Sequence, residues 1–178
     1  CLAEYNAHPQ QEITMTINNL KDVYFDQLQD LHSACTQSME ATTDLGRAAK
    51  DEELSNALIA GVNGISEGLD VLKTICATHD LDPKGEHCKG MEGLATEARA
   101  HGIKADISDD DARDAVIITQ YQRMVHYALA GYGSVVAFAN RLGLDDDAAK
   151  LQKLLDETYD GDRHMTAIAT GGVNKAAA

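Results

Sequence analysis

The chain has 178 residues, of which 44% are hydrophobic and only 4% are aromatic, and it carries a formal net charge of −14. Nucleic acids and anionic membranes are bound chiefly through Lys and Arg side chains, so we expect this acidic chain to bind neither. No run approaches the roughly 18 apolar residues that cross a bilayer, and no positively charged, apolar leader is visible, which predicts a cytoplasmic protein.

The start of the chain lacks a regular pattern, and we predict an N-terminal arm of residues 1–15 before one domain of residues 16–175. Pro9 argues against a backward extension of the first helix, because proline lacks the amide hydrogen that a helix interior needs. We expect Leu2, Tyr5 and Ile13 of this arm to dock into a groove on a neighbouring subunit.

Apolar residues at intervals of three and four predict two long helices in the first half of the chain. The stripe of the first helix is Leu20, Tyr24, Leu28, Leu31, Cys35 and Met39. The stripe of the second helix is Leu54, Leu58, Val62, Ile65, Leu69, Leu72 and Cys76. We expect Gly46 to end the first helix, Asp51 to cap the second, and a turn around Pro83 to follow it.

The segment after this turn is predicted to contain a short helix at residues 91–98 and a loop at residues 102–107. Residues 108–111, Ser-Asp-Asp-Asp, are typical of a capped helix start, because acidic groups are favoured at a helix N-terminus. We expect Ser108 to open this capping box.

Two further long helices are predicted in the second half of the chain. The stripe of the third helix is Ala115, Ile118, Tyr121, Val125, Ala128, Tyr132, Val135, Phe138 and Leu142. The stripe of the fourth helix is Ala148, Leu151, Leu155, Thr158, Asp162, Met165 and Ile168. Gly143 is expected to end the third helix and Asp145 to cap the fourth.

Four long helices with two short hairpin loops and one connection of about 30 residues are typical of one kind of bundle. We therefore predict an all-α fold, a ferritin-like four-helix bundle whose long crossover, between the second and third helices, contains a short helix. The cysteines Cys35 and Cys76 fall on the apolar stripes and are predicted to be buried, reduced thiols.

An ordered set of short motifs in roughly residues 16–175 carries a resemblance to a known family. The motifs are Met91-Glu92-Gly93-Leu94, Glu97-Ala98, Arg113-Asp114-Ala115, Gln122, His126-Tyr127, Ala130-Gly131-Tyr132-Gly133, Leu142-Gly143, Leu151, Leu155 and Val173-Asn174-Lys175. In this order and spacing they resemble the YciE/YciF family of bacterial ferritin-like stress proteins. The resemblance implies a bundle that pairs into a homodimer.

The resemblance also implies a two-metal centre, held by Glu, Asp and His side chains on the inner faces of the four helices. Two cations in one cavity need several anionic oxygens and a His for each metal. The corresponding positions in this chain are Cys35, Asn63, Ser66, Val125, Ala128, Glu157, Thr158 and Asp162. Three of the four helices therefore lack their ligands, and we predict a degenerate site without a cofactor, with iron or manganese as the alternative.

Four polar residues remain as weaker metal-ligand candidates: His32, His126, Glu157 and Asp162. We expect His126 to be a hydrogen-bonded histidine in the core or at an interface. Asp162 lies on an apolar stripe and is expected to pair with a histidine or water, or to be exposed by a rotated helix. Glu67 is a further candidate that could approach the cavity as a substitute acid, although its stripe position is poor. The acidic runs 109–111 and 145–147 are predicted to be helix caps and solvated surface.

The ligand losses favour a non-enzymatic stress-associated or structural protein that acts by associating with itself, as a homodimer or a larger homo-oligomer, or with another protein. The first alternative is a di-iron or di-manganese oxidoreductase of ferroxidase or catalase type. The second is a binder of small apolar ligands, because Gly64, Val125 and Ala128 leave space where larger side chains would stand.

Overall fold

The computed structural model describes residues 16–178, and every regular element in this part of the chain is a helix. The long helices are α1 (Leu20–Ala48), α2 (Glu52–Thr78), α4 (Asp110–Leu142) and α5 (Asp145–Ile168). The shorter elements are α3 (Lys89–Arg99), two turns of π-helix (Ala100–Lys104 and Ala169–Val173) and α6 (Asn174–Ala176). The predicted N-terminal arm, with the subunit contact expected of Leu2, Tyr5 and Ile13, lies outside the described residues.

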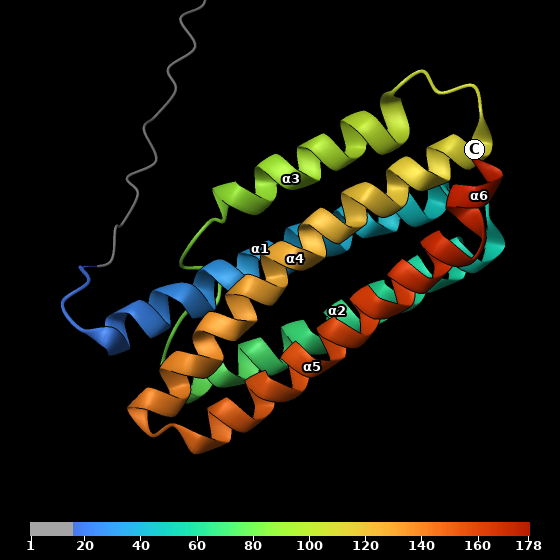
Figure 1. Ribbon diagram of the computed structural model, residues 1–178. Coiled ribbons are helices and arrows are strands. Elements are labelled where there is room, and N and C mark those ends of the chain that lie inside the picture. The colour runs from blue at the N-terminus through green and yellow to red at the C-terminus, as the bar shows by residue number, and fades with distance from the viewer. Residues whose placement is uncertain (1–15) are drawn as a thin grey trace, which may run out of the picture.

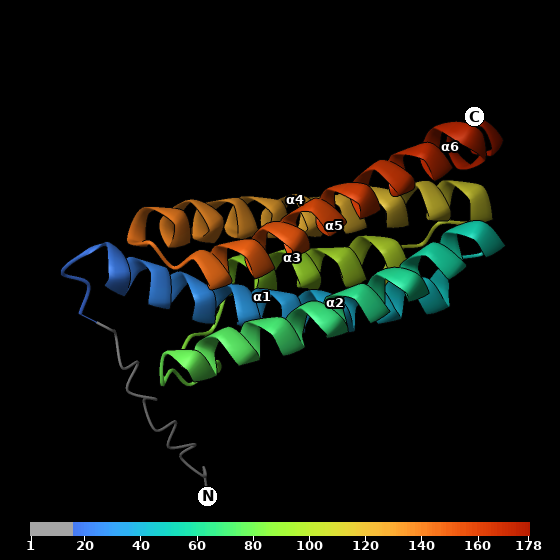
Figure 2. The same cartoon turned by 90° about the horizontal axis from the view of Figure 1, so that it is seen from below.

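The long helices form two hairpins, α1 with α2 and α4 with α5, which pack together as a bundle (Figure 1). Figure 2 shows the hairpins as two layers, with α4 and α5 above α1 and α2. The connection from α2 to α4, residues 79–109, returns along the bundle and contains α3, which packs against α1 and α4. This arrangement confirms the predicted four-helix bundle with a helical crossover.

Two of the predicted helix ends are confirmed, and one is wrong. The Asp51 carboxylate accepts the Leu54 amide hydrogen at 2.8 Å and caps α2. Gly143 ends α4 with a φ of 70°, a left-handed conformation that favours glycine. The helix does not end at Gly46, because α1 continues past it. A Cβ atom at Gly46 would lie 3.3 Å from the Leu58 Cβ, so this glycine lets α1 and α2 pack closely.

The expected caps of the last two long helices are each displaced by one residue. Asp109, not Ser108, caps α4 by accepting the Ala112 amide hydrogen at 2.7 Å. Asp145 is the first residue of α5, and the capping position falls on Leu144, which has no side-chain cap to offer. Asp145 therefore supports this helix only through its charge near the N-terminus.

The loop expected at residues 102–107 is partly helical, because Ala100–Lys104 continues α3 as a turn of π-helix. The guanidinium of Arg113 holds this segment by donating hydrogen bonds of 2.8 to 3.4 Å to four backbone carbonyl groups. These carbonyls belong to Gly102, Ile103, Ala105 and Ile107. A polar side chain from α4 thus satisfies carbonyl groups that the end of a helix leaves free.

The neighbouring Asp114 ties the α1–α2 turn to the start of α4. Its carboxylate is 1% exposed and accepts the backbone amide hydrogens of Lys50, at 2.9 Å, and Asp51, at 2.6 Å. The motif Arg113-Asp114 therefore fixes both the crossover and the first hairpin from a single place on α4.

Apolar side chains from the long helices and from α3 form one continuous core. The free thiols of Cys35, Cys76 and Cys88 are buried in it, as predicted for the first two. Val62 and Ile65 are only partly buried, although they belong to the predicted stripe of the second helix. Within residues 16–178, no helix has the length and apolar character needed to cross a membrane.

Candidate functional site

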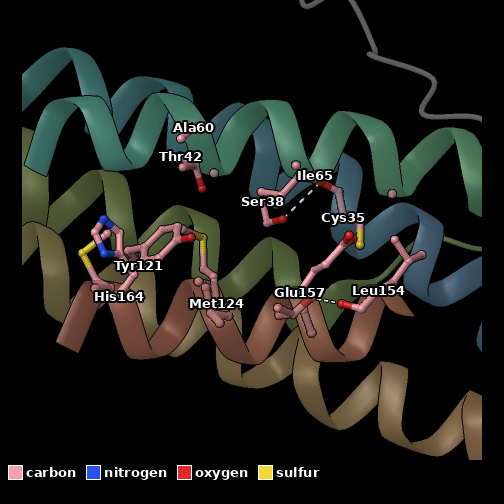
Figure 3. Close-up of a pocket in the computed structure, with 18 of the residues that line it drawn as sticks. Cys35, Ser38, Thr42, Ala60, Ile65, Tyr121, Met124, Leu154, Glu157 and His164 are labelled. Atoms are coloured by element: carbon pink, nitrogen blue, oxygen red, sulfur yellow. Dashed lines mark hydrogen bonds between the residues drawn. The ribbon is translucent and has the colours of Figure 1, made fainter. Parts of the chain in front are cut away.

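A cavity of about 310 Å³ lies among the four long helices (Figure 3). Helix α1 contributes Cys35, Ser38 and Thr42, and α4 contributes Tyr121, Met124, Val125, Ala128 and Tyr132. The walls from α2 and α5 include Gly61, Gly64, Gly68, Leu154, Glu157, Thr158, Gly161, His164 and Met165. Among neighbouring long helices, α2 and α5 contact each other least, so the cavity borders the gap between them.

Two tyrosines of α4 span the cavity and reach α2 at glycines. A Cβ atom at Gly61 would lie 3.0 Å from the Tyr121 hydroxyl oxygen, and one at Gly68 would lie 3.3 Å from that of Tyr132. Gly64 lies between these two contacts along α2, and a Cβ atom there would meet no atom within 4 Å. The open volume therefore lies beside Gly64, between the two tyrosines.

The inner wall of the cavity is uncharged at neutral pH. The Cys35 Sγ atom lies 3.4 Å from the Tyr132 hydroxyl oxygen. Burial raises the pKa of Cys35 to about 11, and burial beside Cys35 raises the pKa of Tyr132 well above its usual range. A protonated thiol and a protonated phenol provide neither a nucleophile nor a general base.

Carboxylates occur only at the solvent side of the cavity. Glu157 has a half-exposed side chain whose Oε1 lies 3.5 Å from the Lys153 ammonium, and Glu67 is also exposed. The Thr158 hydroxyl is used within α5, where it donates to the Leu154 carbonyl at 2.7 Å. Among residues 16–178, no group of three or more His, Cys, Asp or Glu side chains is placed to hold a metal ion.

The structure brings Cys35, Val125, Ala128, Glu157 and Thr158 to this cavity. The assignment of Asn63 and Ser66 to the site is wrong, because both side chains are exposed and neither lines the cavity. Gly64, the residue after Asn63, lines the cavity instead, although it too is exposed. Glu67 lines the cavity, as expected of a substitute acid, although its side chain is exposed.

His126 and Asp162 form a separate pair that lies outside the cavity. The His126 Nε2 atom is 3.2 Å from the Asp162 Oδ1 atom, and Gln122 also donates to this carboxylate oxygen at 3.2 Å. His126 is 64% exposed in its side chain, so it is not a core histidine, and the alternative of an interface histidine stays a prediction. Asp162 is only 18% exposed, because these two partners on α4 cover it. The pairing with a histidine explains how this carboxylate is accommodated on an apolar stripe.

His32 does not join Cys35 in one site. His32 is 5% exposed and lies outside the residues that line the cavity, and its Nε2 atom has no hydrogen-bond partner among residues 16–178. Burial lowers the pKa of His32, and the charges of Lys73 and Lys84 act in the same direction. A buried imidazole whose pKa is lowered in this way is part of the packing.

A second buried polar cluster, which the sequence did not reveal, joins α1 and the end of α2 to the start of α5. The Asp147 carboxylate accepts a hydrogen bond from the Tyr24 hydroxyl at 3.0 Å and lies 2.6 Å from the His79 Nε2 atom. Asp147 is 5% exposed, so the prediction that residues 145–147 are solvated surface is wrong for this residue. The cluster holds the helices together at the opposite end of the bundle from Asp114.

Comparisons with known proteins agree with this fold. Residues 19–178 match the family described as a domain of unknown function (DUF892). Protein YciF of Escherichia coli strain K12 is 32% identical over 166 residues, which cover 92% of this chain and 98% of YciF. The crystal structure of the E. coli stress protein YciF has a TM-score of 0.83 and 31% identity, covering 89% of this chain and 99% of that chain. YcfI from Rhodopseudomonas palustris, a candidate structural protein, has a TM-score of 0.80 and 25% identity, covering 86% of this chain and 96% of that chain.

Proposed function

Because this chain belongs to the DUF892 family of YciF-like proteins, we propose that it is a non-enzymatic stress-associated or structural protein, which acts through contacts with itself or with another protein. The relatives described as a stress protein and a candidate structural protein support this assignment. This chain also shares its fold and nearly its whole length with YciF, which supports a similar role for the two proteins.

The neutral inner wall of the cavity is the observation that carries the proposal. A di-iron or di-manganese oxidoreductase needs several carboxylates and histidines around open metal positions. Here Cys35, Val125 and Ala128 occupy the inner wall, and Glu157 lies at the solvent side beside Lys153. Two cations placed in this cavity would repel each other with little anionic charge between them.

A surface on the hairpin of α1 and α2 supports association with a second copy. Ile59 is 54% exposed and borders a groove that is lined by both helices and includes Thr43, Arg47 and Val62. A twofold dimer brings the same patch of each subunit together, so an exposed Ile59 would be buried against the partner's groove. The net charge of −14 opposes this approach, so we expect salt to strengthen association.

Metal analysis tests the non-enzymatic assignment directly. The protein is purified without chelators from cells grown with added iron and manganese, and its metal content, ferroxidase rate and catalase rate are measured. We expect less than about one metal ion per chain and rates at the level of a buffer blank, because two metals need at least several ligands. Two bound metal ions together with either activity would refute the proposal.

Sedimentation of matched variants tests self-association. Ile59→Lys should lower the dimer fraction, because it places a charge at the proposed contact, whereas Tyr159→Lys alters an apolar residue of similar exposure on α5 and should not. Raising the salt concentration should increase the dimer fraction of the unaltered protein. Equal effects of the two substitutions would remove this surface as the interface.

A further inference from the structure

Tyr121 presents an unused hydrogen-bonding group to the cavity. The side chain is only 6% exposed, and its hydroxyl has no hydrogen-bond partner among residues 16–178. Figure 3 shows Tyr121 lying along the cavity, with its hydroxyl toward Met124. Burial raises the pKa of Tyr121, so the hydroxyl stays protonated and can both donate and accept. A bound molecule with a hydroxyl group would therefore find a hydrogen-bonding partner inside the cavity.

The volume and lining of the cavity suit an aromatic molecule of modest size. An apolar cavity of about 150 Å³ binds benzene, so about 310 Å³ suits a molecule of roughly a dozen non-hydrogen atoms. Met124 and Met165 place thioether groups at the walls, and such groups pack favourably against aromatic rings. The glycines at positions 61, 64 and 68 add no side chain to the wall from α2, which leaves room for a flat ring beside them.

The charges at the solvent side select against anions. Glu67 and Glu157 are exposed where the cavity borders the gap between α2 and α5, and the whole chain carries a net charge of −14. No Lys or Arg side chain lines the cavity. An entering carboxylate or phosphate would lose its hydration without gaining a partner of opposite charge.

We propose that this cavity binds a small, uncharged aromatic molecule with one hydroxyl group, such as a phenol or a naphthol, which pairs with Tyr121. The molecule enters between α2 and α5 and occupies the space beside Gly64, between Tyr121 and Tyr132. Its ring contacts Met124 and Met165, and its hydroxyl meets that of Tyr121. This binding goes beyond the proposed self-association and does not depend on it.

Titration calorimetry with three matched probes tests the proposal. 2-Naphthol supplies the ring and the hydroxyl, 2-methylnaphthalene replaces the hydroxyl by a methyl group, and 2-naphthoate adds a negative charge. We expect 2-naphthol to bind in a saturable manner with a Kd of about 100 µM or tighter, a typical ligand efficiency for its size. 2-Naphthoate should bind at least about tenfold more weakly, because its charge is not matched.

Substitutions at three glycines with open space separate cavity binding from surface binding. Gly64→Leu and Gly161→Leu each place a side chain at the cavity, the first from α2 and the second from α5. Gly93→Leu places the same side chain on the exposed face of α3, away from the cavity. Each cavity variant should weaken 2-naphthol binding by about tenfold or more, because the ligand and the new side chain compete for one volume. Gly93→Leu should leave binding within about twofold, since it changes no lining residue.

Tyr121→Phe tests the hydrogen bond itself. It should weaken 2-naphthol binding by about fivefold and leave 2-methylnaphthalene binding unchanged, because only the first probe uses the hydroxyl. Circular dichroism and urea unfolding check that each variant is folded. The proposal is overturned if 2-naphthol does not bind in a saturable manner, if folded Gly64→Leu and Gly161→Leu both bind it as well as the unaltered protein, or if Tyr121→Phe affects both neutral probes equally.

Discussion

The Sγ atom of Cys35 on α1 lies 3.4 Å from the hydroxyl oxygen of Tyr132 on α4. Both groups are buried and protonated at neutral pH, because burial raises the pKa of each. This contact joins the two hairpins through neutral groups, at a place where a metal-binding bundle needs negative charge. We therefore expect a carboxylate introduced at this contact to destabilise the bundle.

Cys35→Glu should destabilise the protein, and Cys35→Gln provides the matched control without a charge. At pH 7 we expect the free energy of unfolding of Cys35→Glu to be lower than that of Cys35→Gln by about 3 to 5 kcal/mol, because the carboxylate is buried without a partner. Burial raises the folded-state pKa of such an acid, so this difference should shrink as the pH falls toward 5. Urea unfolding at the two pH values measures it. A difference near zero at pH 7 would show that water reaches this position.

Asp114→Ala should detach the α1–α2 turn from α4. The substitution leaves the backbone amides of Lys50 and Asp51 without their acceptor, which should lower the free energy of unfolding by about 2 to 4 kcal/mol. Asp111→Ala removes an exposed acid from the first turn of the same helix and should cost less than about 1 kcal/mol. Urea midpoints of the two variants provide the comparison. Similar losses would mean that Asp114 acts only through the charge at the helix N-terminus.

The sequence predicts the bundle well but places the α2 side of the cavity one residue out of register. Apolar stripes are local patterns, and they locate all four long helices and the crossover helix. In the middle of α2, however, Gly61, Gly64 and Gly68 face inward, and glycines contribute no hydrophobic signal to a stripe. The assignment of Asn63 and Ser66 to the site rests instead on the resemblance to the family, and both residues are exposed.

The buried polar contacts depend on distances that the sequence does not encode locally. Asp147 lies 123 residues from Tyr24 and 68 residues from His79 along the chain, yet all three meet at one end of the bundle. A run of three aspartates at a helix start is typical of solvated surface, and the pairing of α5 with α1 and α2 buries only the third. Helix periodicity shows that position 147 lies on the same stripe as Leu151, which is the one signal that could have indicated its burial.

Two glycines of α3 should respond in opposite ways to alanine. A Cβ atom at Gly90 would lie 2.7 Å from the Tyr127 hydroxyl oxygen, which is itself 3.0 Å from the Cys88 Sγ atom, whereas Gly93 faces open space. Gly90→Ala should therefore lower the free energy of unfolding by about 1 to 2 kcal/mol, because Tyr127 must move. Gly93→Ala should raise it by about 0.5 to 1 kcal/mol, because alanine restricts the unfolded chain. Thermal unfolding of both variants measures the difference, and stabilisation by both would show that Tyr127 moves freely.

His32 should make the protein sensitive to mild acid. Burial lowers its folded-state pKa below the ordinary value of 6.5, so below that pH the unfolded chain binds a proton that the folded protein does not. The free energy of unfolding is therefore unaffected by His32 above about pH 6.5 and decreases as the pH falls toward the folded-state pKa. The decrease is at most about 1.4 kcal/mol for each pH unit. Urea unfolding between pH 7.5 and pH 5, at steps of about half a unit, measures this slope.

The matched comparison uses His32→Leu, which removes the buried imidazole, and His87→Leu, which removes an exposed one paired with Glu92. Below pH 6.5, the free energy of unfolding should fall less steeply with pH in His32→Leu than in the unaltered protein. The variant lacks the imidazole that binds a proton in the unfolded chain but not in the folded protein. His87→Leu should keep the slope that His32 produces, since it leaves the buried imidazole in place. If His32→Leu and the unaltered protein lose stability in parallel over this range, then the acid sensitivity comes from other groups, and His32 takes up its proton while folded.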